Sequence, residues 1–357
     1  MKAMRWNTRN IGTGLLYFYI HFVTEVICFY TLNNYIESPP ITWLLLFAYD
    51  MLAFVPQAVI GYFSDKFPKV PLALLGLPLL AAAMLLQSHT QLTFLSLTLL
   101  CLGNAVIHVN GAEVTLRTSN GSLSHSAIFV SGGSFGVITG KLLSGAGAPY
   151  WLLLFLIISA VPFTILAQMY LKDPTAQGEP CRAFGYHNPN ANKYLVILLA
   201  LVVVITRGFM AYGIPTSWLK TTVQTVLLYV FMGVGKALGG ILSDLFGMKK
   251  VALTSILLAL PLLLFGDRHM YVSLVGILLF SMTMSVTLGI LVSVLPKSPG
   301  LAFGLTTIGL FLGSLPVFFF RIRSVALNTA VLFVLTAVCA ACLFISIRKD
   351  VRDGKPD

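Results

Sequence analysis

The feature that most constrains this chain is a succession of twelve apolar runs, each about 20 residues long, separated by short polar turns. A helical run of this length matches the roughly 30 Å hydrocarbon core of a bilayer. Only 10% of the residues are charged, too few for the polar surface of a soluble domain. The sequence therefore predicts an all-α integral membrane protein. Its twelve transmembrane helices are predicted at 11–32, 41–63, 70–87, 91–113, 124–146, 149–171, 194–215, 221–243, 250–266, 270–294, 299–320 and 325–347.

Two short charged interruptions repeat one pattern in the two halves of the chain. The stretches beginning at Gly61 and Gly240 share the pattern G-x-[FL]-S-D-x-F-[PG], with their aspartates half a chain length apart. This repetition predicts two copies of one unit. A polar segment rich in Pro and Gly lies between them and indicates a linker. We therefore predict an N-terminal six-helix half at 1–171, a cytoplasmic linker at 172–193, and a C-terminal six-helix half with a short charged tail at 194–357.

The distribution of basic residues predicts the orientation of the chain. With the N-terminus inside, 16 of the 23 Lys and Arg residues are cytoplasmic and four are outside. Positive residues mark cytoplasmic loops, so both termini are predicted to be cytoplasmic in the cell (inner or plasma) membrane. The loops also account for the net charge of +11, so we expect no nucleic-acid partner. The five cysteines show no metal spacing, and we expect no metal, no cofactor and a monomer.

The two repeated loops resemble those of the major facilitator superfamily, in which G-x-x-x-D-[RK]-x-G-[RK]-[RK] follows the second helix and a weaker copy follows the eighth. The resemblance implies the major facilitator fold, with two pseudo-symmetric six-helix halves and loops that act as a conformational latch. A plain turn is the alternative. The first copy matches at Gly61, Asp65, Lys66 and Lys69, with Pro68 in the position of the family glycine, and the second at Gly240, Asp244, Gly247, Lys249 and Lys250.

The chemistry of the first loop suggests how a latch would work. Gly61 and Gly240 permit close approach of helices in lipid. Asp65 can accept hydrogen bonds from the N-terminal amides of the following helix, or pair with Arg117. Glu113 lies four residues before Arg117 on the same helical face, and we expect both to belong to the latch.

A second resemblance lies in the fifth predicted span. Gly136 and Gly140 begin a stretch that resembles the signature G-x-x-x-G-P-x-x-G-G of proton-coupled drug exporters, with Lys141 in place of proline. The eleventh span carries a corresponding pair, Gly309 and Gly313, and we expect all four glycines to serve helix packing. The stretch 103–111 resembles F-H-P-E-G of fosmidomycin-resistance exporters only in His108 and Gly111. Together these resemblances imply proton-coupled export, while the departures leave the drug and the coupling open.

Ionisable residues inside the predicted spans are candidates for function, because each costs about 2.5–3.5 kcal/mol near a helix centre. The third, sixth, ninth and twelfth spans contain none. By the resemblance, these four are the peripheral helices and the other eight surround a central cavity. The candidates are His21, Glu25, Asp50, His108, Glu113, Lys141, Arg207 and Lys236.

Three of these candidates are cations that lie at similar depth to two carboxylates, Glu25 and Asp50, at about 1.5 Å per helical residue. An unpaired buried cation is costly, so a bound anion is a plausible partner. We hypothesise a small organic anion held by Arg207 and Lys236, with Lys141 as a third contact. The alternative is that the cations pair only with the two carboxylates or with helix carbonyls, or that one lysine is deprotonated.

Proton coupling is assigned to Glu25 with His21, four residues apart on one helical face, and to Asp50 as a second candidate. A purely structural polar pair is the alternative for His21 and Glu25. His108 is placed toward the cytoplasmic end of its span, together with Glu113, and is interpreted as a satisfied interior histidine.

The predicted function is secondary active transport of a small solute by alternating access, with proton-coupled export (antiport) preferred. Proton- or ion-coupled uptake of an anion is the alternative. No phosphate-binding loop for a nucleotide-driven pump occurs. An intramembrane enzyme or lipid transferase is disfavoured, because no helix carries paired metal-ligand histidines and no nucleophile stands beside a base. A receptor or scaffold with a transporter fold remains a third class.

Overall fold

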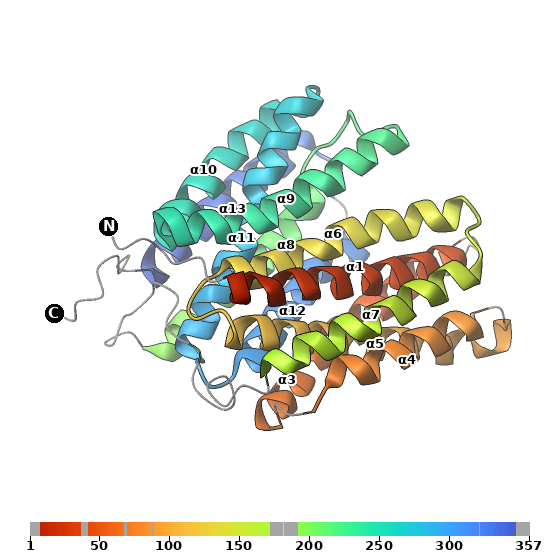
Figure 1. Ribbon diagram of the computed structural model, residues 1–357. Coiled ribbons are helices and arrows are strands. Elements are labelled where there is room, and N and C mark those ends of the chain that lie inside the picture. The colour runs from red at the N-terminus through yellow and green to blue at the C-terminus, as the bar shows by residue number, and fades with distance from the viewer. Residues whose placement is uncertain are drawn as a thin grey trace.

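The computed structural model describes residues 8–36, 42–67, 70–87, 89–171, 181, 192–320 and 322–347. This part of the chain is helical throughout (Figure 1). Its α-helices are α1 (Thr8–Ile36), α2 (Thr42–Phe54), α3 (Pro56–Lys66), α4 (Leu72–Leu86), α5 (Thr93–Arg117), α6 (Ser124–Gly145), α7 (Tyr150–Leu171), α8 (Lys193–Gly213), α9 (Thr222–Phe246), α10 (Met248–Phe265), α11 (Met270–Val294), α12 (Pro299–Phe319) and α13 (Val325–Ser346).

Eleven segments are long and apolar enough to cross a membrane, and α4 is a shorter apolar helix. The segments α2 and α3 form one of these, at Trp43–Lys66, so twelve spans result. The all-helical, twelve-span prediction is confirmed. The predicted linker lies outside the described residues except for Cys181, Asn192 and Lys193.

The second span is broken between α2 and α3 because Pro56 has no N–H to continue the helical ladder. Two side chains bond the carbonyl oxygens at the break. Gln57 Nε2 donates to Ala53 O at 2.8 Å, and Thr307 Oγ1 of α12 donates to Phe54 O at 3.1 Å. The break is therefore bonded partly by a helix from the other half of the chain.

Glycines allow close helix packing within each half, which we call the N-terminal half (α1–α7) and the C-terminal half (α8–α13). A Cβ at Gly136 or Gly140 of α6 would collide with the backbone of α1. A Cβ at Gly313 of α12 would collide with the backbone of α8, and one at Gly309 would press on Val204. Small residues bring backbones together in lipid, where no hydrophobic force holds helices. The same device therefore packs α6 on α1 and α12 on α8.

The two halves meet where α6 packs on α9 and where α12 packs on α2, α3 and α5. We call the end at which α3 and α9 end and α6 and α12 begin the clasp end. Here Gly61 of α3 lies against the backbone of Gly300 in α12, and Gly240 of α9 lies against Ala127 and the Leu123 carbonyl. Neither glycine has room for a Cβ. The halves are in backbone-level contact at the clasp end.

Candidate functional site

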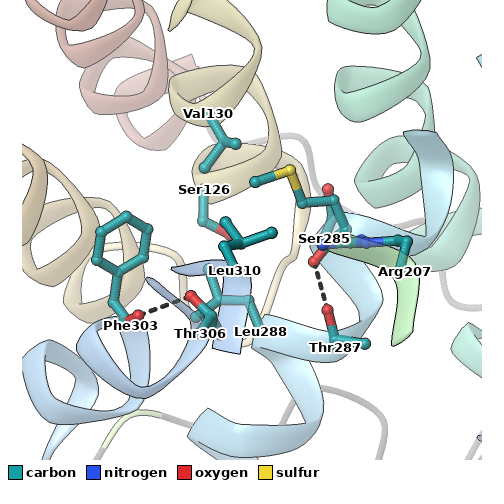
Figure 2. A pocket seen from close by; sticks show the side chains of 10 residues that line it. Ser126, Val130, Arg207, Ser285, Thr287, Leu288, Phe303, Thr306 and Leu310 are labelled. Atoms are coloured by element: carbon teal, nitrogen blue, oxygen red, sulfur yellow. Dashed lines mark hydrogen bonds between the residues drawn. The ribbon is translucent and has the colours of Figure 1, made fainter. Parts of the chain in front are cut away.

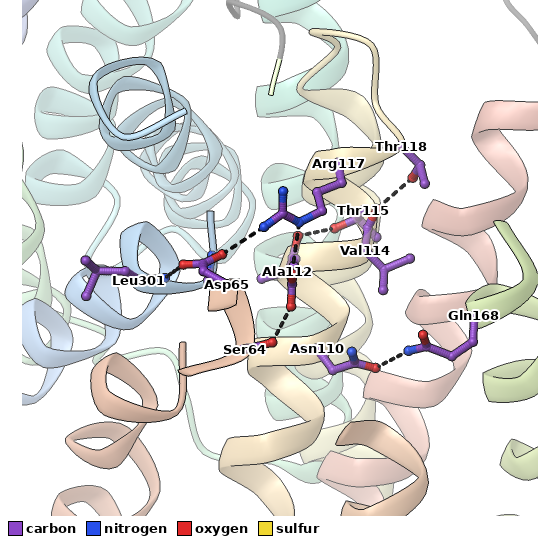
Figure 3. A network of polar contacts seen from close by, with 12 residues as sticks. Ser64, Asp65, Asn110, Ala112, Val114, Thr115, Arg117, Thr118, Gln168 and Leu301 are labelled. Atoms are coloured by element: carbon purple, nitrogen blue, oxygen red, sulfur yellow. Dashed lines mark hydrogen bonds and ion pairs between the residues drawn. The ribbon is translucent and has the colours of Figure 1, made fainter. Parts of the chain in front are cut away.

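Asp65, at the end of α3, binds the N-terminus of a helix from the other half. Its two carboxylate oxygens accept hydrogen bonds from Gly300 N at 3.0 Å and Leu301 N at 2.9 Å, in the first turn of α12. Arg117 Nη2 donates to Asp65 Oδ1 at 3.2 Å (Figure 3). The first amides of a helix lack partners inside the helix and carry a partial positive charge. The carboxylate therefore holds the two halves together at this point.

Arg117 is itself held by a second carboxylate. Its Nε donates to Glu113 Oε1 at 2.9 Å, and Ser64 Oγ donates to Glu113 Oε2. Glu113 and the Arg117 side chain are buried. We call Asp65, Arg117 and Glu113 the charged clasp.

Asp244 makes the equivalent contact in the reverse direction. From the end of α9 it accepts from Leu123 N at 2.8 Å and Ser124 N at 2.9 Å, at the start of α6. The hydroxyls of Ser122, at 2.6 Å, and of Ser124 also donate to its Oδ2. We call Asp244 with these two serines the hydroxyl clasp. Each half thus grips a helix N-terminus of the other.

The clasp differs in one respect from the sequence expectation. Asp65 caps α12 and not the following helix, α4, whereas its pairing with Arg117 matches the alternative stated above. Lys66 lies over the Tyr62 ring and Lys249 over the Phe344 ring, both within their own half. Lys69 lies outside the described residues.

Inside the N-terminal half, Glu25 is surrounded by two histidines and an amide. His108 Nε2 lies 3.3 Å from Glu25 Oε1, and His21 Nε2 lies 3.8 Å from the same oxygen. Asn104 Nδ2 donates to that oxygen at 3.0 Å. All four residues are buried, and the two imidazole rings meet edge to face with centroids 4.3 Å apart.

His108 is a buried, hydrogen-bonded histidine, as expected, but its contact with Glu25 was not foreseen from the sequence. Counted from the clasp end, His21 lies ten residues beyond residue 11 and His108 nine residues before Arg117, which are nearly equal depths. That count was the available signal, since helices of opposite direction bring such residues together. Asn104 gave no signal of its own, because its carboxylate partner lies on a different helix.

The three candidate cations have no carboxylate partner within 4.0 Å among the described residues. Arg207 is buried and its Nη1 donates to Thr283 Oγ1 at 3.4 Å. Lys141 donates to Tyr229 OH at 3.1 Å and lies near the rings of Tyr229 and Phe29. Lys236 is half-buried, within electrostatic range of Glu25 and Arg207.

Arg207 lines a small pocket between the halves, of about 10 Å³, which is room for one water molecule. In Figure 2 Arg207 lies on one side and Phe303 on the other. Neither Lys141 nor Lys236 lines this pocket, so the structure does not gather the three cations in one place. The walls come from α6, α11 and α12, through Ser126, Val130, Met284, Ser285, Thr287, Leu288, Phe303, Thr306 and Leu310.

Phe303 separates the pocket from the histidine cluster. Its ring stacks on His108 with centroids 6.4 Å apart and contacts Phe129 at 6.1 Å. Asp50, the remaining candidate carboxylate, is half-buried on α2, and no hydrogen bond reaches it from the residues the structure describes. It lies within electrostatic range of Glu25.

Comparison with known proteins bears on the fold. No family model matches the chain, and no curated protein matches it in sequence. The human organic anion transporter MFSD10 (TETRAN) is similar in structure, with a TM-score of 0.67 and 14% identity, covering 97% of this chain and 100% of that one. A variant of the Escherichia coli fucose:proton symporter FucP gives 0.62 at 14% identity, over 96% and 98%.

A second structure of FucP, in its outward conformation, gives a TM-score of 0.60 at 14% identity, over 98% of this chain and 99% of that one. Its printed description names the major facilitator superfamily. The similarity covers nearly the whole chain in each case. The chain therefore has the twelve-helix fold of the major facilitator superfamily transporters.

Proposed function

We propose that this protein is a secondary transporter that moves a small organic anion by alternating access between its two halves. The observation that carries the proposal is Arg207, a buried cation at the boundary between the halves whose hydrogen-bond partner among the described residues is a hydroxyl. An arginine stays charged in a protein interior, and a buried charge needs a counter-charge. A carboxylate or phosphate of the solute supplies one and matches the planar donor fork.

Lys236 and Lys141 are the proposed further contacts. Lys236 lies within electrostatic range of Arg207 and has no ion pair in the described part of the chain. Lys141 is set apart with Tyr229, so we assign it to the path of the solute. Glu25, which could have neutralised Lys236, instead contacts His21, His108 and Asn104. This use of Glu25 favours an external anion over internal pairing.

The two clasps supply the proposed conformational step. Asp65 and Asp244 each bind amides of the opposite half, so separating the halves at the clasp end breaks both sets of hydrogen bonds together. Such paired contacts favour two discrete states over gradual opening. We propose that the solute site faces alternate sides as the clasps close and open.

Proton coupling is proposed through Glu25 and His21, with Asp50 as the second carrier, and export by antiport is preferred over uptake by symport. Of the similar structures, one is described as an organic anion transporter and another as a fucose:proton symporter. The unpaired cations of this chain favour an anion as its solute. The antiporter-like stretch at Gly136 and Gly140 supports export.

The proposal is tested with purified protein in proteoliposomes. A thermal-shift screen against anionic metabolites and phosphonates first identifies a stabilising solute, and flux of that solute is then measured with and without an imposed proton gradient. Arg207→Gln and Lys236→Gln should abolish flux at normal expression. Lys220→Gln, an exposed cation, is the matched control. Undiminished flux in the Arg207 and Lys236 variants, or hits only among cationic solutes, would refute the anion site.

A further inference from the structure

Three metal-ligating atoms converge in the N-terminal half. His21 Nε2, His108 Nε2 and a Glu25 carboxylate oxygen all lie within 4.8 Å of one another, and all three residues are buried. The histidines come from two helices, α1 and α5, so spacing along a single helix does not reveal the group. No metal site was expected from the sequence, because no single helix carries two histidines at metal-ligand spacing.

The tautomers of the two histidines are fixed by the backbone. His21 Nδ1 lies 2.9 Å from Phe129 O, and His108 Nδ1 lies 2.9 Å from Asn104 O. A carbonyl oxygen only accepts, so each Nδ1 carries a hydrogen and each neutral ring presents the Nε2 lone pair. Two lone pairs and a carboxylate oxygen then face one another out of water. Such a convergence of acceptors is stabilised by a cation among them, either a proton on one Nε2 or a metal ion bound by all three.

The distances suit a first-row transition metal. Metal–ligand bonds of about 2.0–2.1 Å in a tetrahedral site place neighbouring ligand atoms about 3.3–3.4 Å apart. The His108–Glu25 separation is 3.3 Å and the His21–Glu25 separation is 3.8 Å. The two histidine ligand atoms lie within 4.8 Å of each other, so the rings have to move together for all three ligands to bind one ion. Imidazole with one carboxylate is a ligand set for zinc, iron, nickel and copper, not for calcium or magnesium.

The surroundings of the three ligands also match a metal site. Each histidine donates its other ring N–H to a backbone carbonyl, and the carboxylate accepts from Asn104 Nδ2 at 3.0 Å. These are the contacts that orient ligands in known sites. Gly133 of α6 makes the space for the His21 ring, since a Cβ there would collide with Nε2.

We propose that His21, Glu25 and His108 form a three-ligand binding site for a divalent transition-metal ion, with Zn²⁺ and Co²⁺ as probes. The site is independent of the solute and of the direction of transport. It shares Glu25 and His21 with the proposed proton path, so metal and proton compete for the same atoms. A bound Zn²⁺ therefore acts as an inhibitor or as the coupling cation itself.

Equilibrium binding of the metal alone tests the proposal. Tag-free protein in nanodiscs is titrated with Co²⁺, followed by the visible absorption of four-coordinate Co²⁺, and bound metal is counted by mass spectrometry. One ion per chain is expected, displaced by Zn²⁺. His108→Ala and Glu25→Gln should remove it. Asn104→Ala, which leaves the ligands in place, should weaken binding about 10–100-fold.

His269→Ala is the matched control, because His269 is exposed at the start of α11 and far along the chain from the cluster. Its affinity should equal that of the wild type. Absence of Co²⁺ binding by the wild type, or equal binding by folded His108→Ala protein, would overturn the proposal. No solute is present in this experiment, so either result leaves the transport proposal untouched. Conversely, failed transport with intact Co²⁺ binding would refute the transport proposal and leave the metal site standing.

Discussion

The two halves of this protein share one framework and carry opposite interiors. In the middle of the N-terminal half, away from the clasp, a buried carboxylate, Glu25, contacts two histidines and an amide. In the C-terminal half a buried cation, Arg207, touches one hydroxyl. A buried charge without a counter-charge is costly, and of these two charges Arg207 is the one without an ion pair among the described residues. The comparison favours Arg207 of the C-terminal half as the main contact of the proposed solute.

The clasps repeat this difference at the clasp end. Both bind a helix N-terminus of the other half, but Asp65 has Arg117 and Glu113 beside it whereas Asp244 has Ser122 and Ser124. In the charged clasp, Arg117 is the partner of both carboxylates, so removing it leaves two buried charges without a counter-charge. The hydroxyl clasp contains only neutral donors.

The largest effect is expected from giving Arg207 a partner of its own. Thr283 Oγ1 lies 3.4 Å from Arg207 Nη1, so Thr283→Asp should place a carboxylate there and occupy the solute's position. Solute flux should fall on the order of 100-fold, since a fully paired arginine no longer needs the solute. Thr283→Asn is the matched control and should retain most of the flux. Wild-type flux in Thr283→Asp would show that Arg207 does not bind the solute.

Arg117→Met should be the most destabilising change at the clasps. It leaves the buried carboxylates of Asp65 and Glu113 without their cation, a loss of about 3–5 kcal/mol. Ser124→Ala in the hydroxyl clasp should cost about 1 kcal/mol. Thermal unfolding followed with a thiol-reactive dye measures both, because all five cysteines are buried in the folded chain. Equal losses in the two variants would contradict the distinction between the clasps.

Opposite signs are expected when each interior charge is replaced by an apolar side chain. Glu25→Leu should lower the free energy of unfolding by about 1.5–3 kcal/mol, because hydrogen bonds to a charged group are lost. Arg207→Met should raise it by about 1–3 kcal/mol, because a charge buried without an ion pair is removed. The two melting temperatures, measured without solute, check this prediction. A loss of stability in Arg207→Met would mean that Arg207 is a structural residue.

The smallest effect is expected at Lys66. Its ammonium group lies 4.3 Å from the Tyr62 ring centroid on the surface of its own half, and its loss should cost less than about 1 kcal/mol. Lys66→Ala should therefore leave the melting temperature and the solute flux near wild-type values. A loss of stability as large as that of Arg117→Met would show that Lys66 belongs to the charged clasp.

The membrane spans were predictable because the length and the apolarity of a span can be read from its own stretch of sequence. The loops at Gly61 and Gly240 were also predictable, because they share one sequence pattern half a chain length apart. What the sequence could not supply were contacts between distant helices. Asp65 was expected to cap the next helix in the chain, yet the helix that presents its amides to Asp65 begins at Pro299. The sequence around Asp65 indicated that it would bind helix N-terminal amides, but not which helix would provide them.

The candidate site shows the same limit. The pairing of Glu25 with His21 was found because they lie four residues apart on one helix. The contacts of His108 and Asn104 with Glu25 were missed because these residues reach Glu25 from another helix. The three cations were correctly placed inside helices, but depth along a helix does not give rotation about its axis. Lys141 accordingly faces Tyr229, and it does not line the pocket with Arg207.

The backbone contact between Gly61 and Gly300 has a consequence for the resting state of the protein. A single methyl group at either position would collide with backbone atoms of the opposite helix, and one at Gly300 would also press on the Asp65 carboxylate. In the proposed transport cycle, such a substitution should favour the state in which the two halves are separated at the clasp end. The absence of a side chain at Gly61 and at Gly300 is therefore what allows the two halves to meet at the clasp end.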